Sequence, residues 1–361
     1  MKLGFALEYS LGHATHAQNL KAILAKDLTV EPSYFDLPFH NTPGLWSRIP
    51  GVRSNWSLRA SLAAYMALRP KAGNLQACLF HTQVTSLFSA GLMRRMPSVI
   101  SMDATPVQYD TLGALYGHTP SAHMRVERIK MHLNIRAFDA AQKIVTWSQW
   151  TKESLVRDYG VPCAKILVIP PGIDTERWRL TPPIATAHEP VNLLFVGGDF
   201  ERKGGRSLLE AFEIVARSEK VHLHIVTKSG RIFQEVPNIT VYQNVSPNSE
   251  ILLDLFRKAD IFVFPTLADC LPLALMEAMA AGRPVITTNV GALPEAITHG
   301  ETGLIVPTRD AGALASAIIV LVQDRGLRAQ LGRRAREVAI ERFDASTNYT
   351  GLVNVVKSVT R

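Results

Sequence analysis

The chain has 361 residues, of which 47% are hydrophobic and 19% charged, and this is the composition of a globular protein. Because a single hydrophobic core stops growing at roughly 250 to 300 residues, we expect two domains. The three cysteines lie far apart in the sequence, which excludes a disulfide framework and a cysteine-rich zinc site. The first residues lack the pattern of a secretory leader, and no apolar run reaches the roughly 18 residues of a membrane span. These features favour a soluble, cytoplasmic protein that is attached to a membrane surface at most.

The positive charge of the chain is confined to its first half. Residues 1–172 hold 18 Lys and Arg against 10 Asp and Glu, a net charge of +8, and the remaining residues hold 21 of each kind. An anionic partner of the first half, such as acidic lipid or an anionic acceptor, would explain this asymmetry. A solvated basic surface is the alternative. Nucleic acid is not expected, because no known nucleic-acid-binding module accompanies the charge.

Short apolar runs alternate with amphipathic stretches along the first half. The runs cover residues 2–7, 77–83, 98–105, 143–149 and 165–171. Runs of this kind, separated by helical patterns such as the one over 121–142, are typical of buried parallel strands. A proline-rich stretch without apolar periodicity follows over 170–190 and predicts a linker.

The same alternation resumes beyond the linker. Apolar runs recur at residues 191–198, 221–227, 239–245, 261–267, 283–289 and 303–307, and two helical patterns follow over 333–343 and 349–359. The chain is therefore predicted to be an α/β protein of two doubly wound, Rossmann-like domains. We expect the first to span residues 1–172 and the second 173–340, with a C-terminal helix over 341–361 that packs back on the first domain.

A glycine-rich turn follows the first apolar run of the second half. Gly197 and Gly198 end the run, and Arg202 and Lys203 follow before a helical pattern begins. Glycines let backbone N–H groups approach a phosphate, and the helix that follows presents the positive end of its dipole. The turn therefore predicts a pyrophosphate site. An ordinary strand-to-helix turn with an exposed basic pair is the alternative.

Two carboxylates stand eight positions apart near the end of a later apolar run. Asp269 lies in the loop after the run, and Glu277 lies inside the predicted helix that begins near Leu273. One ligand could meet both carboxylates, with Glu277 accepting hydrogen bonds from the vicinal hydroxyls of a ribose. The alternative has Asp269 as a helix cap and Glu277 as an exposed helical residue.

These second-half motifs resemble those of the retaining glycosyltransferases of family four, which have the GT-B fold of two Rossmann-like domains facing a central cleft. The likeness rests on a Gly-Gly…Lys-Gly turn and on a Glu-x7-Glu signature, whose second Glu binds the ribose and whose first lies beside the transferred sugar. The resemblance assigns these roles to Glu277 and Asp269, and assigns the pyrophosphate to Lys203 and Arg202. The expected nucleotide-sugar site also includes Gly197, Gly198, Leu271, Pro272 and Leu273.

Several positions depart from the family pattern. The first carboxylate of the signature is Asp269, one methylene shorter than the usual Glu, and the tripeptide after it is Cys-Leu-Pro where Gly-Phe-Gly is usual. In the family an arginine often follows the glycine at the end of the first strand of the second domain. That arginine is absent here, so Arg202 would supply the missing charge. Asp103 stands where many relatives have a histidine, and it could accept a hydroxyl of the sugar or the acceptor. We expect the catalytic set to be Asp269, Lys203, Arg202 and Asp103.

Polar residues of the first half give further candidates for contact with a phosphate or the acceptor. Gly12, His13 and His16 follow the first strand, where the family has a glycine-rich loop, and His118 lies in a region expected near the cleft. Lone histidines are also common in ordinary loops and helices, which is the alternative for each. A third metal ligand is not found beside the histidines, so no metal site is predicted.

A stretch over residues 46–71 is basic and aromatic. It combines Trp46, Trp56, Leu58 and Tyr65 with Arg48, Arg53, Arg59, Arg69 and Lys71. A basic amphipathic surface with tryptophans suits an anionic membrane interface. It equally suits a helix that faces the core and exposes a solvated basic side.

The sequence as a whole predicts a retaining glycosyltransferase of the hexosyltransferase type. Its expected partners are a nucleotide-sugar donor and a saccharide or lipid-linked acceptor, without cofactor or metal, in polysaccharide or glycolipid biosynthesis at the inner face of the cell membrane. A sugar-nucleotide epimerase of the same fold and a catalytically idle sugar-nucleotide-binding protein are the alternatives. A nicotinamide-dependent oxidoreductase is disfavoured, because the Gly-x-Gly-x-x-Gly motif is missing after the first strand.

Overall fold

The chain forms two compact units. The computed structural model describes residues 1–10, 12–38, 56–116, 124–180, 190–229 and 237–360. The first unit consists of Met1–Gly172 together with Ala345–Arg361, and the second of Ile173–Asp344. The chain thus returns to the first unit at Ala345, a few residues after the position 341 that the sequence suggested.

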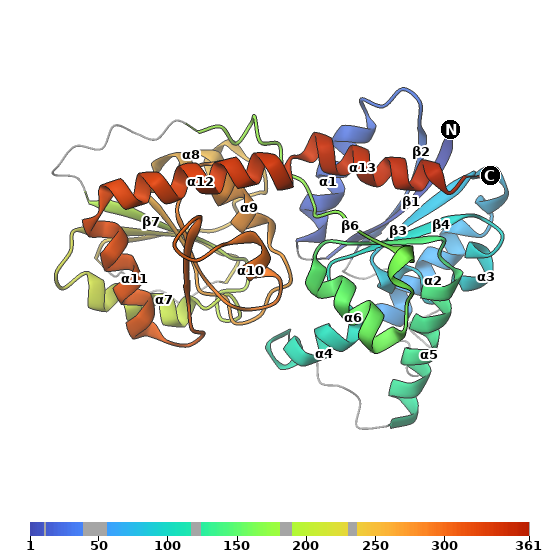
Figure 1. Cartoon of the computed structure of the whole chain (residues 1–361), viewed down its shortest axis with the longest axis horizontal. Helices are drawn as coiled ribbons and strands as arrows, with labels where there is room; N and C mark the ends of the chain where they lie inside the picture. The colour runs from blue at the N-terminus through green and yellow to red at the C-terminus, as the bar shows by residue number, and fades with distance from the viewer. Residues whose placement is uncertain (11, 39–55, 117–123, 181–189, 230–236, 361) are drawn as a thin grey trace. The chain divides into compact units, whose positions relative to one another are not determined.

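A six-stranded parallel sheet forms the centre of the first unit, in the order β2-β1-β3-β4-β5-β6 (Figure 1). The strands are β1 (Lys2–Tyr9), β2 (Glu31–Pro38), β3 (Ala77–His81), β4 (Ser98–Met102), β5 (Lys143–Thr146) and β6 (Ile166–Val168). Every residue of β3 and β4 is buried, which is why these strands are continuous apolar runs in the sequence. Strand β2 is half-exposed and lacks such a run, and the sequence analysis did not find it.

Helices cover both faces of this sheet. They are α1 (His13–Leu24), α2 (Trp56–Leu68), α3 (Ala90–Met93), α4 (Pro106–Leu112), α5 (Met124–Ala140), α6 (Gln149–Tyr159) and α13 (Ala345–Ser358). Short 3₁₀ turns occupy Ala72–Asn74, Gln83–Thr85, Gly113–Tyr116 and Cys163–Lys165. One core joins the sheet to α3, α5 and α6, and another joins it to α1 and α13.

The C-terminal helix α13 is part of the core of the first unit. Its residues Leu352, Val353 and Val356 are buried against α1 and the sheet, and the two helices lie side by side in Figure 1. The backbone that leaves the unit at Gly172 lies directly against the backbone that re-enters it at Ala345. A Cβ atom on Gly172 would lie only 2.3 Å from the Cα of Ala345. The last helix therefore completes a hydrophobic core that the first 172 residues alone would leave open on one face.

The second unit has its own parallel sheet of six strands, in the order β12-β11-β10-β7-β8-β9. The strands are β7 (Val191–Val196), β8 (Val221–Val226), β9 (Ile239–Tyr242), β10 (Ile261–Phe264), β11 (Val285–Thr288) and β12 (Gly303–Val306). The chain builds outward from β7 through β8 and β9, and then returns to place β10 on the other side of β7. The order of strands thus reverses between β7 and β10, and such a switch point leaves a crevice at the carboxyl ends of the strands.

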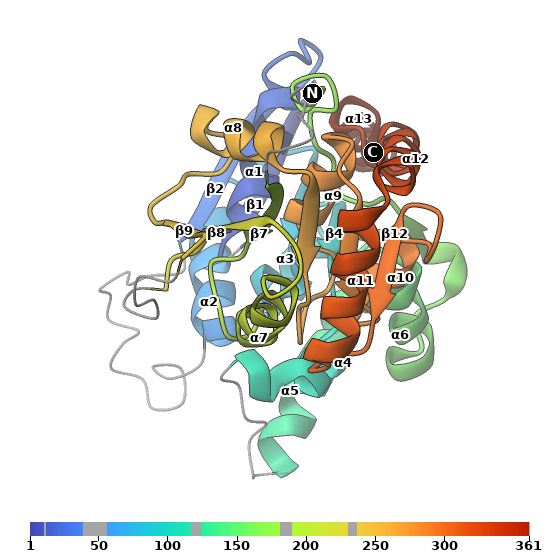
Figure 2. The same ribbon diagram turned by 90° about the vertical axis from the view of Figure 1, so that its left-hand side faces the viewer.

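Helices also cover both faces of the second sheet. They are α7 (Gly205–Val215), α8 (Glu250–Lys258), α9 (Leu273–Ala280), α10 (Leu293–Ala296), α11 (Ala311–Gln323) and α12 (Arg325–Phe343). Helices α7 and α11 pack side by side over one face (Figure 2). On the other face the ring of Phe256 in α8 stacks on Phe262 of β10, with ring centroids 5.5 Å apart. The prediction of two doubly wound α/β domains is confirmed.

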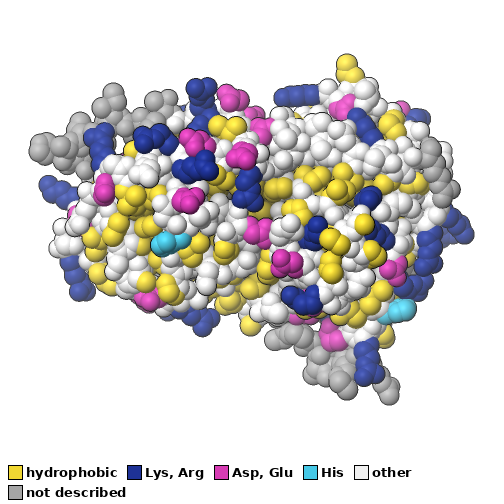
Figure 3. Space-filling view, in the orientation of Figure 1, with side chains coloured by type: hydrophobic (Ala, Val, Ile, Leu, Met, Phe, Trp, Pro, Cys, Tyr) yellow, Lys and Arg dark blue, Asp and Glu magenta, His cyan; other side chains and the backbone are white. Residues whose placement is uncertain are grey.

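The surface of α12 carries charges of both signs. Its charged side chains are arginines and glutamates, as in the pair of Arg334 and Glu337 at 3.0 Å, and basic and acidic side chains are interspersed on the face drawn in Figure 3. None of the helices in the described ranges is long and apolar enough to cross a lipid bilayer.

Candidate functional site

Two loops interlock at the switch point of the second sheet. The loop after β7 reaches α7 through Gly204, which has a φ of +80°, and a Cβ atom there would lie 1.9 Å from the carbonyl oxygen of Pro265. Pro265 directly follows β10. Only glycine accommodates both this backbone conformation and this approach. Gly204 is therefore needed to bring the two loops into direct contact.

Arg202 ties the same two loops together. Its side chain is buried and donates from Nη1 to the carbonyl oxygen of Ala268 at 2.8 Å, and from Nε to Asp199 at 3.2 Å. The Arg202 carbonyl in turn accepts from the N–H of Leu267 at 2.9 Å. The sequence motif predicts that Arg202 supplies charge for a phosphate. The structure places its guanidinium between the loops, where it holds the site together.

Lys203 and Asp269 form an ion pair across the two loops. Both side chains are largely buried, 13% and 11% exposed, and the Lys203 ammonium also lies 5.1 Å from the ring centroid of Phe264. Burial lowers the pKa of Lys203, and the neighbouring Asp269 opposes that shift. The basic residue of the turn and the first carboxylate of the signature are thus brought together, which their separation in sequence did not reveal.

The loop after β11 closes around Asp269 from a third side. Gly291 has a φ of +56°, and a Cβ atom there would lie 2.1 Å from the carbonyl oxygen of Asp269. The N–H of Ala292 donates to the carbonyl oxygen of Cys270 at 2.9 Å. Leu271, Pro272 and Leu273 are buried, and α9 begins directly after Pro272. The Cys-Leu-Pro tripeptide is therefore an enclosed apolar segment.

Glu277 lies in α9 with a side chain that has little contact with water. The residue is 4% exposed, and burial raises the pKa of its carboxyl group to about 7. Within the described ranges no hydrogen-bond donor or basic group is placed on this carboxylate. A buried carboxylate without donors is costly, because ionisation removes a charge from water without replacing its hydrogen bonds. Glu277 is therefore buried, which contradicts the alternative of an exposed helical residue. Its carboxylate offers two acceptor oxygens to a ligand.

The candidate residues of the first unit gather at the carboxyl ends of its strands. His13 begins α1, and its Nε2 faces the Asp103 carboxylate at 3.6 Å. His16 is buried, and its Nδ1 lies 3.1 Å from the Tyr349 hydroxyl in α13. Gly12 is exposed just before α1. His118 lies outside the described residues.

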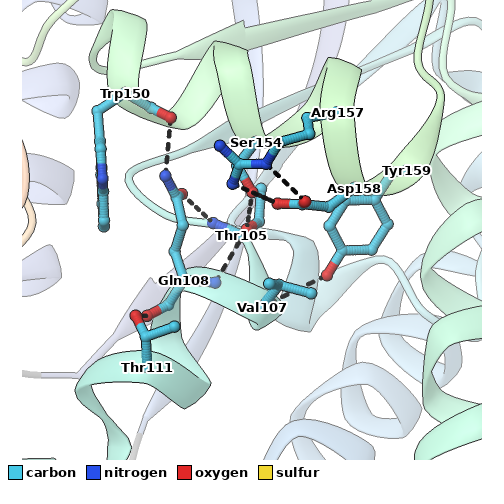
Figure 4. Close-up of polar contacts among 9 residues, drawn as sticks. All are labelled: Thr105, Val107, Gln108, Thr111, Trp150, Ser154, Arg157, Asp158 and Tyr159. Carbon is cyan, nitrogen blue, oxygen red and sulfur yellow. Dashed lines mark hydrogen bonds and ion pairs between the residues drawn. The ribbon is translucent and has the colours of Figure 1, made fainter.

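A polar network fixes the segment that carries Asp103. The Thr105 hydroxyl caps α4 and contacts the Ser154 hydroxyl of α6 at 2.6 Å, and Ser154 donates to Asp158 at 2.7 Å (Figure 4). The Gln108 amide donates to the Trp150 carbonyl at 2.7 Å. These bonds join the turn after β4 to α6 and so hold the backbone on which Asp103 stands.

Sequence reasoning missed His81, Trp147 and Glu8 in this unit. His81 ends β3, Trp147 directly follows β5 and Glu8 lies near the end of β1, and all three are buried. The usable signal was a polar or amphipathic residue at the carboxyl end of each apolar run. Because these ends meet at one edge of a parallel sheet, residues far apart in the sequence form one cluster there.

The basic stretch over 46–71 is described from Trp56 onward. Arg69 and Lys71 are exposed, and the Lys71 ammonium lies 5.5 Å from the ring centroid of Phe35. The Nε atom of Arg59 in α2 is buried and has no hydrogen-bond partner among the described residues. Arg59 therefore does not belong to a fully solvated basic side, whereas Arg69 and Lys71 are exposed. Trp46, Arg48 and Arg53 lie outside the described ranges.

Comparison with known proteins gives similarities in both halves of the sequence. Residues 12–177 match the family described as Glycosyltransferase Family 4, and residues 190–324 match Glycosyl transferases group 1. The chain is 29% identical to glycogen synthase of Mycobacterium tuberculosis over 233 residues, which are 61% of this chain and 55% of that protein. The chain thus spans about half the length of the curated relatives it matches.

Solved structures with the same fold cover the whole chain. Sucrose-phosphate synthase from Thermosynechococcus elongatus has a TM-score of 0.77 at 18% identity, over 99% of this chain and 98% of that one. HepE from Anabaena, in complex with UDP-glucose, has a TM-score of 0.72 at 17% identity, over 99% and 100% of the two chains. The fold is therefore GT-B, and together the similarities support a glycosyltransferase. Among the described residues no group of three or more His, Cys, Asp or Glu side chains could hold a metal ion.

The close approach at Gly204 predicts a large and local loss of stability. Gly204→Ala should lower the free energy of unfolding by about 2 to 4 kcal/mol, because alanine would adopt a strained φ and push its Cβ into the Pro265 carbonyl. Gly198→Ala is the matched control, since a Cβ there meets only the Lys228 side chain at 3.6 Å. Urea unfolding followed by circular dichroism measures both. Equal stabilities of the two variants would contradict the interlocked loops.

Because the Glu277 carboxyl is buried, replacing it by an amide should raise the free energy of unfolding by an amount that depends on pH. Its pKa is about 7 in the folded chain against 4.5 for an ordinary glutamate, so its contribution to stability is fully present below pH 4.5 and is lost as the pH rises to 7. Glu277→Gln cannot ionise. Its stability relative to the natural chain should therefore increase by about 2 to 3 kcal/mol between pH 5 and pH 8.

The matched control for this prediction is Glu213→Gln, at an exposed position of α7. It should shift the unfolding midpoint equally at both pH values. A stability difference for Glu277→Gln that stays constant from pH 5 to pH 8 would show that the Glu277 carboxylate is solvated or paired.

Proposed function

We propose that the chain is a retaining glycosyltransferase. It moves a sugar, of the hexosyl type, from a nucleoside-diphosphate sugar to a saccharide or lipid-linked acceptor, without a divalent metal or other cofactor. The observation that carries the proposal is the buried carboxylate of Glu277, which has two acceptor oxygens and no donor within the described ranges. A ribose diol supplies two hydroxyl donors at the spacing of one carboxylate.

The leaving group would lie at the interlocked loops after β7 and β10. The N-terminus of α7 follows Gly204, with Gly197 and Gly198 nearby in the same loop, so backbone N–H groups and the helix dipole favour a diphosphate there. Lys203 adds a formal charge that would stabilise the departing diphosphate more in the transition state than in the ground state. Arg202 contributes indirectly, by holding the two loops at the distance the ligand requires.

Ligand binding would exchange the partner of Lys203. In the structure its ammonium pairs with Asp269. The diphosphate would take over as the anionic partner, and Asp269 would then accept hydroxyls of the transferred sugar. This places charge recognition and sugar recognition in two neighbouring side chains, with Leu271, Pro272 and Leu273 as the apolar wall that excludes water.

The chemical step exchanges one bond for another at the anomeric carbon. The acceptor oxygen attacks from the face on which the diphosphate departs, so the anomeric configuration is retained. The carbon–oxygen bond to the acceptor forms as the bond to the diphosphate breaks, and the acceptor proton passes to the departing phosphate. Positive charge from Lys203 and from α7 would take the role that a divalent cation has elsewhere.

The donor screen tests this function directly. A thermal-shift series with UDP-glucose, GDP-glucose and ADP-glucose should raise the melting temperature with one nucleotide class, because a ligand that binds only the folded state stabilises it. Glu277→Gln should weaken that binding about 10- to 100-fold through loss of a charged acceptor, while Glu213→Gln should not. The effective donor should then support transfer in excess EDTA with retained anomeric configuration.

Four outcomes would overturn parts of the proposal. No stabilisation by any nucleotide sugar removes the donor site. Free or altered sugar without transfer indicates an epimerase or hydrolase, and binding without turnover indicates an idle binding protein. Activity that EDTA abolishes and manganese restores contradicts the metal-independent step.

A peripheral contact with anionic lipid at the inner face of the membrane is the proposed setting. The net charge of +8 over residues 1–172 and the exposed Arg69 and Lys71 support it. Reversing both charges, Arg69→Glu with Lys71→Glu, should weaken flotation with phosphatidylglycerol vesicles about tenfold or more, since each basic side chain contributes about 1 kcal/mol. Lys220→Glu, at an exposed site of the second unit, is the control. If the chain does not bind these vesicles at low salt, the membrane setting is wrong and the acceptor is a soluble saccharide.

A further inference from the structure

The strand order of the first unit also has a switch point. The chain places β2 on one side of β1 and then β3 on the other, so the order reverses between β1 and β3. His13 follows β1, and His81 is the last residue of β3. Asp103 follows β4, the next strand of the sheet. The three side chains therefore meet at the edge where doubly wound sheets bind ligands.

These three side chains form a polar chain that runs from the interior to the surface. Nε2 of His81 lies 3.0 Å from Nδ1 of His13, and Nε2 of His13 faces Oδ2 of Asp103 at 3.6 Å. His81 is fully buried, whereas the side chains of His13 and Asp103 are 15% and 21% exposed. A ligand could therefore reach Asp103 and His13, and His81 could act only through His13.

The surroundings of His81 decide its charge and its orientation. Burial lowers its pKa well below 6.5, and the positive charge that His16 and His13 could carry acts in the same direction, so the His81 ring is neutral. Its ring stacks on the ring of His16 with centroids 4.3 Å apart, and Trp147 packs nearby at 5.7 Å. A neutral, packed imidazole carries one N–H in a fixed direction.

The location of that proton follows from the partners of the two rings. Nδ1 of His81 has no partner among the described residues. If Nδ1 carried the proton, a buried N–H would be unsatisfied, and the lone pair of His13 Nε2 would face the Asp103 carboxylate. If Nε2 carries the proton, it donates to His13 Nδ1, and His13 then carries its own proton on Nε2, toward Asp103. The second arrangement satisfies the buried Nε2–H of His81 and turns the N–H of His13, rather than its lone pair, toward the Asp103 carboxylate 3.6 Å away, so it is favoured.

Asp103 is the accessible acceptor of this edge. The other nearby carboxylate, Glu8, already accepts from Ser10 and from the Thr82 hydroxyl, the latter at 2.6 Å. Burial raises the pKa of Asp103, and the adjacent His13 opposes that shift. Backbone N–H groups of Asp103 and Ala104 also hydrogen-bond to this carboxylate and oppose the shift. An N–H of His13 turned toward the carboxylate adds a favourable charge–dipole contact, and the side chain is 21% exposed, so a ligand hydroxyl can reach it.

We propose that His81 is a positioning residue that fixes the Nε2–H tautomer of His13, and that the Asp103 carboxylate that this N–H faces accepts a hydroxyl of the sugar substrate. The identity of the ligand rests on the proposed glycosyl transfer. The tautomer does not, because it is a property of the unliganded chain.

The tautomer can be read directly by NMR. In the full chain with ¹⁵N-labelled histidine rings, long-range ¹H–¹⁵N correlations should show His13 protonated at Nε2. His81→Phe retains a ring on His16 but removes the donor, and His13 should then populate both tautomers. His81→Gln restores a donor at a similar position and should restore the Nε2–H signal. His16→Phe is the matched control, since His16 is equally buried and makes no hydrogen bond to His13.

Kinetics with the donor found by the screen test the second part. His81→Phe and Asp103→Asn should each lower kcat/KM about tenfold, the effect of one lost hydrogen bond, and His81→Gln should recover most of the loss. A proton on Nδ1 of His13 in the natural chain, or an unchanged tautomer in His81→Phe, overturns the role of His81. Unchanged kinetics in Asp103→Asn overturns the hydroxyl contact. If the natural chain shows no transfer, the proposed function fails, and the tautomer still decides the role of His81.

Discussion

The contact of the Gly204 backbone with the Pro265 carbonyl is the constraint on which the second unit's site depends. It brings the loops after β7 and β10 together at the point where the strand order reverses, and it does so because Gly204 has no side chain to push the Pro265 carbonyl away. Arg202 then bridges the loops from inside, and Lys203 reaches Asp269 across them. With a larger residue at 204 the loops would separate. The ion pair of Lys203 and Asp269 and the N-terminus of α9 would then move with them.

The charged side chains of this site are largely buried even without a ligand. Lys203 and Asp269 neutralise each other, whereas Glu277 is buried without a donor and its pKa is raised to about 7. Such a group lowers the stability of the empty protein at neutral pH, and a ligand that donates hydrogen bonds would remove the cost. Binding energy and folding stability are therefore coupled through one side chain.

The first unit places its polar cluster by the same topological rule with different chemistry. Its reversal lies between β1 and β3, and the cluster there consists of imidazole rings, Trp147 and carboxylates. Helix α13 contributes Tyr349 to this cluster through the hydrogen bond to His16. The last helix thus supports both the core and the polar edge of a unit whose remaining residues end at Gly172.

The sequence by itself determined the fold class and the residues near the second unit's switch point. Apolar runs at regular spacing predict parallel strands wherever both faces are buried, and glycines followed by a basic pair predict a turn into a helix, because these patterns depend on local backbone and burial requirements. Only the tertiary structure decided how the charges are used. Whether Arg202 faces a phosphate or a carbonyl, whether Glu277 meets water, and whether His13 meets His81 all depend on loops that lie far apart in the sequence and adjacent in space. No local pattern encodes such distances, since they are set by the order in which strands join the sheet.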